Sequence, residues 1–369
     1  MRSDRTKPLY MCVCGARPNF MKVAPVVHAL SEAGTAETLL VHTGQHYDAN
    51  MSRLFFDELG IPEPDVNLEV GSGTHAAQTA EVMKRLEPVC VEHRPDWVIV
   101  VGDVNSTMAG ALVATKLGIR VAHVEAGLRS FDRSMPEEIN RVVTDCVSDV
   151  LLATEPSGVE NLRREGVTDG KVHLVGNVMV DTLLRHRAKA DESNVLNSLG
   201  LKSKCFALVT LHRPSNVDDP NVMTGILDAL QQVGTDMPVV FPAHPRTTGN
   251  LRSLNLLSRV EQDKTLRMIQ PLGYLDFVKL MAEAAVVLTD SGGIQEETTV
   301  LGVPCLTLRE NTERPITVTQ GTNRLTGSDP RAILAGYRAA RDNPQRDAQI
   351  PDLWDGHAAE RIVKVLASV

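Results

Sequence analysis

Short apolar runs alternate with longer amphipathic stretches along the whole chain. The centre of each run is continuously apolar, as is typical of strands that are buried on both faces of a parallel sheet. Runs of this kind occupy residues 9–15, 38–44, 96–103, 120–127, 149–155, 171–177, 206–212, 238–244, 266–271, 285–291 and 303–309. The alternation predicts an α/β protein in which helices cover both faces of parallel sheets.

The chain is too long for a single compact core. Its 369 residues exceed the size at which one hydrophobic core stops growing, so two domains are expected. Residues 185–204 are polar and lack a strand-like run, and we place the passage between the sheets near Gly176. This predicts a first domain over 1–175 and a second over 176–351, with a helix within 352–369 packing back on the first.

Local signals mark several helix ends. Residues 105–107 are Asn-Ser-Thr and are expected to cap a helix that ends at Gly118. Pro156 is expected to open a helix that ends at Gly166.

Composition excludes several classes of function. A net charge of −8 and an aromatic content of 4% disfavour a nucleic-acid surface, which needs basic stripes and stacking rings. An anionic small molecule is still compatible, because one local cationic pocket can override the overall sign. The chain has no run of about 18 apolar residues and its N-terminus has no signal-peptide cleavage pattern, so we expect a cytoplasmic protein without membrane contact.

Metal and cofactor signals are weak. The six cysteines are scattered rather than grouped in CxxC pairs, which argues against disulfides and zinc and predicts small core side chains. His42 and His46 have metal-ligand spacing, but no second cluster completes a coordination sphere. GSGTHA at 71–76 matches part of a dinucleotide-binding pattern, but no acidic residue follows at the required distance. We therefore expect no metal ion and no cofactor.

Side chains at the carboxyl ends of the predicted strands are the main functional candidates, because ligands of open α/β sheets bind beyond those ends. These candidates are Arg17, Lys22, Gln45, His46, Asp103, Glu125, His212, His244 and the turn at 290–293. Arg17 and Lys22 would form a cationic pole after the first strand, although such residues near a helix start are elsewhere usually solvated.

The Asp-Ser-Gly-Gly stretch at 290–293 leaves an apolar strand and enters a helix. Free N–H groups at a helix start, with glycines that permit close approach, form an anion site suited to phosphate. A turn that merely needs glycine explains the motif equally well. Glu296 or Glu297 could accept hydrogen bonds from ribose hydroxyls, and Arg309 and Arg314 could neutralise a diphosphate. Together these features indicate half of a nucleotide-diphosphate site.

Three carboxylates in the first half are candidates for acid–base chemistry. Asp103 and Glu125 end neighbouring predicted strands and Glu137 opens a predicted helix, so their side chains could converge and transfer protons. Alternatively, Asp103 caps its helix and Glu137 complements a helix N-terminus, which explains each residue alone but less well all three. His212, followed by Arg213, ends the first strand of the second domain and is expected to complement them across a cleft.

Taken together, GARPNFMK, HTGQHYD, VGDVNST, HVEAGLRS, PEEINR, TLHRPSN, DSGGIQEE and ERP resemble the non-hydrolysing UDP-N-acetylglucosamine 2-epimerases. The resemblance implies two Rossmann-like doubly wound parallel-sheet domains in a glycosyltransferase-B-like fold, with the active site in the interdomain cleft. It further implies a homodimer that interconverts UDP-N-acetylglucosamine and UDP-N-acetylmannosamine without nicotinamide.

The resemblance also implies a mechanism. A base removes the proton at sugar C2 while the C1–oxygen bond breaks, giving UDP and a 2-acetamidoglucal, and UDP adds back after a proton returns to the other face. The residues that match the family's catalytic positions are Asp103, Glu125, Glu137, His212 and Arg141. Those that match substrate- and UDP-binding positions are Arg17, Lys22, Arg213, His244, Ser291, Gly292, Gly293, Glu297, Arg309 and Arg314.

Two departures from the family pattern bear on the ligand. Asn19 stands where many members have glutamate, which would alter substrate contacts near the first-strand loop. GSGTHAAQT replaces a Glu-Arg-Gln run of an allosterically activated subset, so activation by a second UDP-N-acetylglucosamine beside Gln45 and His46 is not expected. The alternatives are a same-mechanism epimerase of a 2,3-diacetamido uronic acid nucleotide, a hydrolysing epimerase, a glycosyltransferase-B-type transferase and a non-catalytic nucleotide-sugar sensor.

Overall fold

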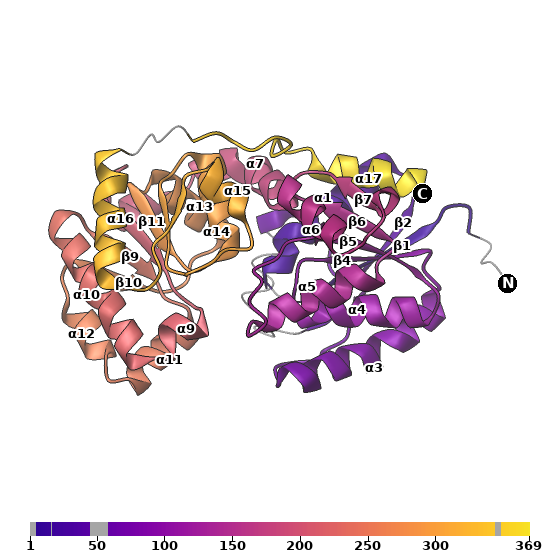
Figure 1. The fold of residues 1–369 in the computed structure, drawn as a ribbon, viewed down its shortest axis with the longest axis horizontal. Coiled ribbons are helices and arrows are strands. Elements are labelled where there is room, and N and C mark those ends of the chain that lie inside the picture. The colour runs from indigo at the N-terminus through magenta and orange to yellow at the C-terminus, as the bar shows by residue number, and fades with distance from the viewer. Residues whose placement is uncertain (1–4, 16, 45–57, 344–347) are drawn as a thin grey trace. The chain divides into compact units, whose positions relative to one another are not determined.

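The computed structural model describes residues 5–15, 17–44, 58–343 and 348–369. The chain forms two compact units, which are Met1–Arg185 with Asp352–Val369, and His186–Pro351 (Figure 1). Residues 176–185, which the apolar pattern placed in the second domain, belong to the first unit. The reason is that helix α7 (Val178–Asp191) crosses the boundary, and its start is anchored in the first unit through Asp181, which accepts hydrogen bonds from the N–H groups of Ala358 and Ala359.

The first unit contains a seven-stranded sheet in the order β3-β2-β1-β4-β5-β6-β7, and the neighbouring strands are parallel. The strands are β1 (Leu9–Cys14), β2 (Glu37–His42), β3 (Val66–Asn67), β4 (Trp97–Val101), β5 (Arg120–Ala126), β6 (Val150–Ala153) and β7 (Val172–Leu174). The helices are α1 (Arg17–Ala33), α3 (His75–His93), α4 (Asn105–Lys116), α5 (Pro136–Val147), α6 (Pro156–Arg164), the 3₁₀ turn η1 (Asp169–Lys171), the first half of α7, and α17 (Ala358–Ser368), which packs against α1.

The second unit contains a six-stranded parallel sheet in the order β10-β9-β8-β11-β12-β13. The strands are β8 (Ala207–Thr210), β9 (Val239–Pro242), β10 (Leu266–Ile269), β11 (Val286–Thr289), β12 (Cys305–Thr307) and β13 (Asn323–Leu325). The helices are α8 (Val195–Ser198), α9 (Pro214–Val217), α10 (Pro220–Asp236), α11 (Pro245–Ser253), α12 (Leu257–Gln262), α13 (Tyr274–Glu283), α14 (Gly292–Leu301), α15 (Pro315–Thr319) and α16 (Pro330–Asp342).

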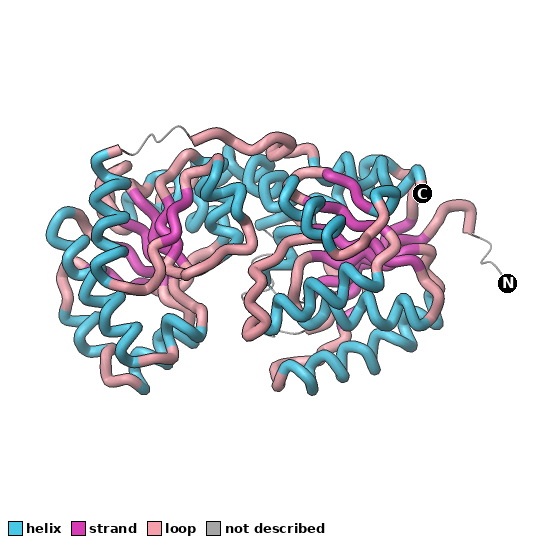
Figure 2. Tube along the Cα trace, in the orientation of Figure 1, coloured by secondary structure: helices cyan, strands magenta, loops and turns pink. Residues whose placement is uncertain are grey.

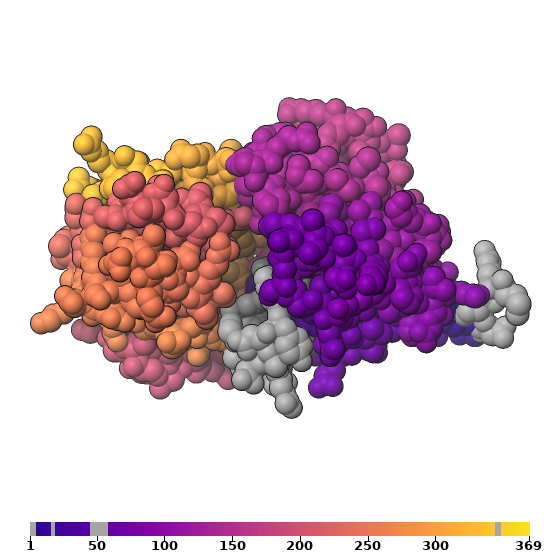
Figure 3. All heavy atoms as spheres, turned by 90° about the horizontal axis from the view of Figure 1, so that it is seen from below, coloured from indigo at the N-terminus to yellow at the C-terminus, as the bar shows by residue number. Residues whose placement is uncertain are grey.

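Helices cover the strands of each sheet, which therefore form a central layer within each unit (Figure 2). Every residue of β1, β4 and β6 is buried, as expected for strands covered on both faces. Figure 3 draws all heavy atoms of the two units as spheres and shows the surface that their helices and loops form. Every predicted strand is present, and the structure adds β3 and β13, whose sequences, Val-Asn and Asn-Arg-Leu, do not form an apolar run.

Two local predictions are wrong in part. The N-cap of α4 is Val104 rather than residues 105–107, because Thr107 Oγ1 turns inward and donates to the Val101 carbonyl at 2.7 Å. Four cysteines are buried as predicted, whereas Cys146 and Cys205 are exposed.

Within the described ranges, no helix combines the length and apolar character that a membrane span requires.

Each sheet has one point where the strand order reverses. In the first unit the chain builds outward from β1 on one side and from β4 on the other, and in the second unit the same reversal lies between β8 and β11. Loops diverge at such a switch point and leave a crevice beyond the strand ends. The residues that follow β1, β4 and β5, and those that follow β8 and β11, are therefore placed to meet a ligand.

Candidate functional site

Glu125 lies near the carboxyl end of β5, beside the strand that borders the first switch point, and is 4% exposed. The strand is irregular here, because the β5–β6 register shifts between Val124 and Ala126 and Glu125 itself has a φ of 75°. A positive φ in a non-glycine residue costs ~1–3 kcal/mol, and residues of this kind cluster at functional sites. Glu125 forms an ion pair with Lys22 of α1, which is also buried. The structure thus brings together one predicted carboxylate and one predicted cation.

The turn after β4 approaches this ion pair closely. Gly102 has a φ of 67°, and a Cβ atom at this position would lie 2.9 Å from Lys22 Nζ and 3.6 Å from Glu125 Oε2. Only glycine combines this conformation with such an approach. Asn19 Nδ2 donates to the Val101 carbonyl at 2.9 Å, so the residue that departs from the family pattern contacts the same turn.

Asp103 follows that turn, and its side chain is 22% exposed. Arg141 Nη1 donates to Asp103 Oδ2 at 2.5 Å, and Asn140 Nδ2 donates to the Asp103 carbonyl at 2.8 Å. Helix α5 therefore holds Asp103 by both its side chain and its backbone. The N-cap of α4 is Val104, and Asp103 immediately precedes it.

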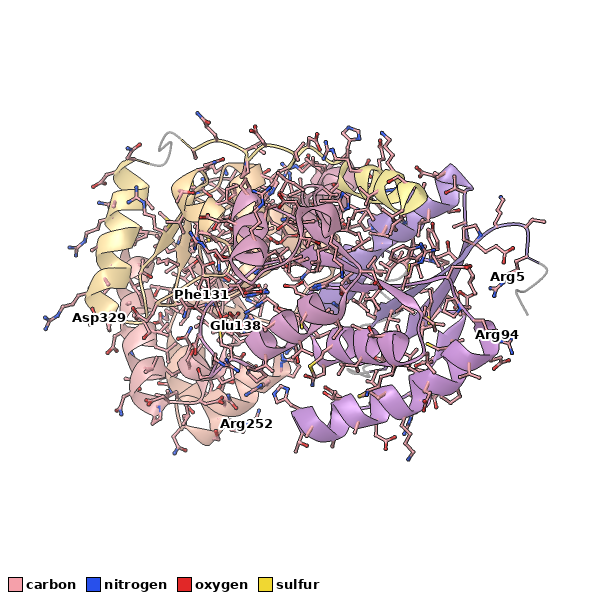
Figure 4. The ribbon with its side chains drawn as sticks, turned by 45° about the vertical axis from the view of Figure 1, so that its right-hand side comes forward. Arg5, Arg94, Phe131, Glu138, Arg252 and Asp329 are labelled. Carbon is pink, nitrogen blue, oxygen red and sulfur yellow. The ribbon has the colours of Figure 1, made fainter. Side chains whose placement is uncertain are left out.

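Glu137 and Glu138 share the first turn of α5 but differ in their surroundings. Glu138 is 3% exposed and accepts from the N–H groups of Ser130 and Phe131, each at 2.9 Å, and from Arg141 Nη2 at 2.7 Å (Figure 4). Burial alone would raise the pKa of Glu138, but these hydrogen bonds lower it. Glu137 is half-buried. Adjacent glutamates carry no sequence signal that separates them, so the contact of Glu138 with Arg141 was missed.

A second buried group lies behind this turn. His123 on β5 is fully buried, with Nδ1 2.6 Å from Asp145 Oδ1 and Nε2 2.8 Å from the Gly102 carbonyl oxygen. Asp145 Oδ2 accepts from Arg129 Nη1 at 2.7 Å and from the Gly127 N–H at 3.1 Å. Burial alone would raise the pKa of Asp145, but His123 and Arg129 lower it. The one signal for this pair is a histidine inside an apolar strand.

His212 lies at the switch point of the second unit, where its side chain is 49% exposed and its Nδ1 is 2.8 Å from Asp290 Oδ1. Asp290 is buried and also accepts from the N–H groups of His212 and Arg213 and from Asn216 Nδ2. Burial would raise the pKa of Asp290, but the hydrogen bond from His212 and the others lower it. An ionised Asp290 selects the tautomer with a proton on Nδ1, which leaves His212 Nε2 to exchange a proton. Asp290 was noticed only as a strand end, and its role as partner of His212 was missed.

Ser291 is the N-cap of α14, and Gly292 and Gly293 form its first turn. A Cβ atom on Gly292 would lie 2.6 Å from Arg314 Nη1 and 2.7 Å from Glu313 Oε1. Glycine at position 292 is therefore required by the packing of the following loop, independently of any ligand. Its predicted contact with a phosphate stays a prediction.

Arg309 and Arg314 lie in a buried network of charges. Arg314 donates from Nε to Glu296 Oε1 and from Nη1 to Glu313 Oε1, both at 2.6 Å. Arg309 Nη2 donates to Glu313 Oε2 at 2.8 Å. Two guanidinium groups thus share two carboxylates, so much of their charge is compensated inside the unit. That they neutralise a diphosphate stays a prediction.

Glu297 differs from its neighbour Glu296. It is 4% exposed and accepts a hydrogen bond from the Tyr274 hydroxyl at 3.2 Å. Burial raises the pKa of Glu297 to about 8, although the bond from Tyr274 lowers it, and the charge of Glu296 adds to the rise. A carboxyl group in this state can donate as well as accept a hydrogen bond. Of the two glutamates, Glu296 pairs with Arg314, whereas Glu297 pairs with the Tyr274 hydroxyl.

The remaining predicted residues are less informative. His244 is exposed at the N-cap of α11, where its Nδ1 accepts from the Arg246 N–H at 3.2 Å, and Arg213 is half-buried. Arg17 begins α1, but its side chain, like the whole of Gln45 and His46, lies outside the described residues. In the part of the chain that the structure describes, no three His, Cys, Asp or Glu side chains are grouped to hold a metal ion.

With its two doubly wound parallel sheets, the chain has the glycosyltransferase-B-like fold of α/β proteins. A sequence profile of the UDP-N-acetylglucosamine 2-epimerases matches residues 28–367, and the chain belongs to this family. The family predicted from the motifs is thereby confirmed, and the protein is an epimerase.

Relatives and solved structures agree with this placement. The UDP-N-acetylglucosamine 2-epimerase of Methanocaldococcus jannaschii is 43% identical over 362 residues, which cover 96% of this chain and 97% of that protein. A crystal structure of the M. jannaschii enzyme in complex with UDP-GlcNAc and UDP superposes with a TM-score of 0.92 at 40% identity, covering 98% of this chain and 100% of that one. The glycotransferase of kitacinnamycin, 13% identical with a TM-score of 0.64, shares the fold alone.

Proposed function

We propose that the protein interconverts UDP-N-acetylglucosamine and UDP-N-acetylmannosamine without hydrolysis. The observation that carries this proposal is the arrangement at the first switch point, where Glu125 pairs with Lys22 and Asp103 is held by Arg141. Inversion at sugar C2 requires a proton to leave one face and return to the other, so two carboxylates held by separate partners suit the reaction.

In the proposed reaction, a carboxylate takes the proton from C2, and the electron pair of that bond forms the double bond between C1 and C2. The bond between C1 and the diphosphate oxygen breaks, and its electron pair leaves with UDP. The intermediate is a 2-acetamidoglucal. A proton then returns to C2 on the other face, and UDP re-forms its bond to C1. The steps balance without a cofactor.

Asp103, Glu125 and Glu137 are proposed as the proton-transfer groups, with Arg141 as the side chain that orients Asp103. His212 is proposed to act where negative charge develops on the departing UDP. Its Nδ1 is bonded to Asp290 and its ring is half exposed, which suits an imidazole that supplies a proton or a positive charge only as the bond breaks.

The UDP moiety is assigned to groups that surround the second switch point and the start of α1. The helix start supplies N–H groups, and Glu297 is suited to the ribose hydroxyls because it has one phenol partner rather than an arginine. The residues proposed to bind UDP are Arg17, Lys22, Arg213, His244, Ser291, Gly292, Gly293, Glu297, Arg309 and Arg314.

A second candidate substrate is favoured by one specific similarity. A Pseudomonas aeruginosa protein named UDP-2,3-diacetamido-2,3-dideoxy-D-glucuronate 2-epimerase is 42% identical, over 97% of this chain and 99% of that protein. Overall identity therefore does not separate this sugar from UDP-N-acetylglucosamine. Hydrolysing epimerases and glycosyltransferase-B-type transferases are further alternatives, and they differ in their products.

One experiment distinguishes these reactions. The protein is incubated in deuterated water with UDP-N-acetylglucosamine, and separately with the diacetamido uronate nucleotide. Deuterium at C2 in a sugar that still carries UDP supports the proposal, whereas deuterium in a free sugar indicates hydrolysis. Exchange with the uronate nucleotide alone would identify the second substrate. Tight UDP binding without exchange on either nucleotide would contradict an epimerase function and favour a transferase or a sensor.

We also propose that the protein acts as a cytoplasmic homodimer, as its family resemblance implies. Light scattering coupled to gel filtration would measure its mass in solution, and a mass of one chain would contradict the dimer. Cell fractionation would locate it, and recovery in a membrane or secreted fraction would contradict the cytoplasmic assignment.

A further inference from the structure

The two ring nitrogens of His123 both face hydrogen-bond acceptors. Nδ1 is 2.6 Å from a carboxylate oxygen of Asp145, and Nε2 is 2.8 Å from the carbonyl oxygen of Gly102. The second Asp145 oxygen accepts from Arg129 and from the Gly127 N–H, as an ionised carboxylate does. A carbonyl oxygen can only accept, so each ring nitrogen must carry a proton. His123 is therefore a buried imidazolium.

The contacts of His123 fix the turn that carries Asp103. The Gly102 N–H donates to the Val124 carbonyl at 3.0 Å, while the Gly102 carbonyl accepts from His123. His123 and Val124 are the two residues that immediately precede Glu125. The N–H and the carbonyl of Gly102 are thus both hydrogen-bonded to residues of β5 that lie next to Glu125. These two bonds fix the position of the Asp103 backbone relative to that of Glu125.

Asp145 extends this connection to α5. It follows Arg141 by four residues and Glu137 by eight, so the three side chains lie on one face of the helix. The bond between His123 and Asp145 therefore joins β5 to the helix that presents Glu137 and holds Asp103 through Arg141. The three segments that carry the proposed proton-transfer groups meet at this one histidine.

We propose that His123 and Asp145 are a positioning dyad for the epimerase reaction. The dyad sets the Gly102–Asp103 turn, the irregular part of β5 at Glu125 and α5 relative to one another. Neither residue contacts the sugar. The proposal rests on the proposed function in one respect, because misplacement of these segments is measured as a loss of exchange at sugar C2.

The surrounding charges are balanced, which makes a buried imidazolium tenable. Asp145 faces His123 and Arg129, and Arg129 in turn donates to Glu165 from Nε at 2.8 Å and from Nη2 at 2.6 Å. Two cations thus alternate with two carboxylates. A neutral His123 would turn a nitrogen lone pair toward either the Gly102 carbonyl oxygen or the Asp145 carboxylate, which leaves two acceptors without a proton between them.

The protonation state can be measured without any activity. Nitrogen-15 NMR of the whole protein, with its histidine rings labelled, should show an imidazolium signal at pH 7.5 that is absent from His123→Gln. A His123 signal typical of a neutral ring, with one bare nitrogen, would overturn the proposal.

Kinetics test the positioning role. His123→Gln and Asp145→Asn should each lower kcat for C2 exchange by about 100-fold while KM and the Kd for UDP change less than about threefold, because misplacing reacting groups by about 1 Å costs that much. His173→Gln, the same change on β7 of the same sheet, is the matched control and should retain the wild-type kcat. Wild-type kcat in His123→Gln would overturn the proposal.

If the wild-type protein exchanges no UDP-sugar, the proposed function fails, and the NMR result alone decides the state of the dyad. If either variant fails to fold, NMR of the wild-type protein likewise decides.

Discussion

Each unit places a histidine–aspartate pair close to its switch point, and the two pairs differ in what they leave open. His123 is fully buried and both of its nitrogens are bonded, to Asp145 and to the Gly102 carbonyl. His212 has one nitrogen bonded to Asp290, and half of its ring is exposed. The first pair is suited to holding groups in place, whereas the second is suited to exchanging a proton.

The same difference extends to the charged groups around each pair. In the first unit, the Lys22–Glu125 and Arg141–Asp103 pairs each join a cation on a helix to a carboxylate at or just after the end of a strand. In the second unit, Arg309 and Arg314 come from the loop after β12 and pair with carboxylates nearby. The ion pairs of the first unit therefore lie next to its sheet, whereas those of the second unit lie in a loop. A substitution at Arg309 or Arg314 should accordingly change ligand affinity and stability more than the rate of the chemical step.

The largest effect is expected for Asp103→Asn. The amide keeps the shape and the hydrogen bond to Arg141 but cannot take a proton, so C2 exchange should fall by about 1000-fold or more. The Kd for UDP should stay within about threefold of the wild-type value, as measured by calorimetry. Asp169→Asn changes an exposed aspartate in the same unit and should have no effect. Full exchange activity in Asp103→Asn would remove this residue from the reaction.

His212→Asn and Asp290→Asn should lower exchange by about 100-fold to 1000-fold, because the first removes the proton carrier and the second its tautomer control. UDP should still bind to both variants. The exposed His357→Asn is the control. If Asp290→Asn left the rate and its pH profile unchanged, the open histidine–aspartate pair would have no part in catalysis.

Arg314→Ala should weaken UDP binding by about 10-fold and lower the free energy of unfolding by about 3 kcal/mol. Both effects follow from one cause, since removing the guanidinium takes one cation away from the buried carboxylates of Glu296 and Glu313. Calorimetry and urea unfolding measure the two quantities. Arg163→Ala removes an exposed arginine and is the control. A variant that is destabilised but binds UDP with unchanged affinity would show that Arg314 serves only the loop.

The sequence and the structure agree best where chain topology alone decides. Asp103 and Glu125 could be placed at adjacent strand ends because apolar runs show where parallel strands end, and β4 and β5 are indeed neighbours. The partners of those residues could not be predicted, since the Arg141–Asp103 and His123–Asp145 contacts join segments that are separated along the chain. Hydrophobic periodicity records burial, and it carries no record of which buried polar groups meet.

The arginines illustrate the same limit more strongly. Arg309 and Arg314 were recognised as cations near a candidate phosphate turn, but nothing in their spacing indicated that Glu296 and Glu313 already engage them. Likewise, the preference for Glu297 over Glu296 came from family resemblance. The structural difference between them lies in Tyr274, a residue on α13 that no local pattern connects to α14.

The smallest effect is expected from Glu297→Gln, and it depends on pH. The pKa of Glu297 rises from its ordinary value of 4.5 to about 8 on folding, so the folded protein binds more protons than the unfolded chain between these values. The stability associated with protonated Glu297 is therefore complete below pH 4.5 and is lost as the pH rises toward 8. Glutamine mimics the protonated form, so the variant should match the wild-type Tm near pH 5 and exceed it by about 2–4 °C at pH 8.5. As a control, Glu160→Gln changes an exposed glutamate, and its plot of Tm against pH should superimpose on that of the wild type. If the plots for Glu297→Gln and the wild type were parallel, this carboxyl group would be ionised in the folded protein across the whole pH range.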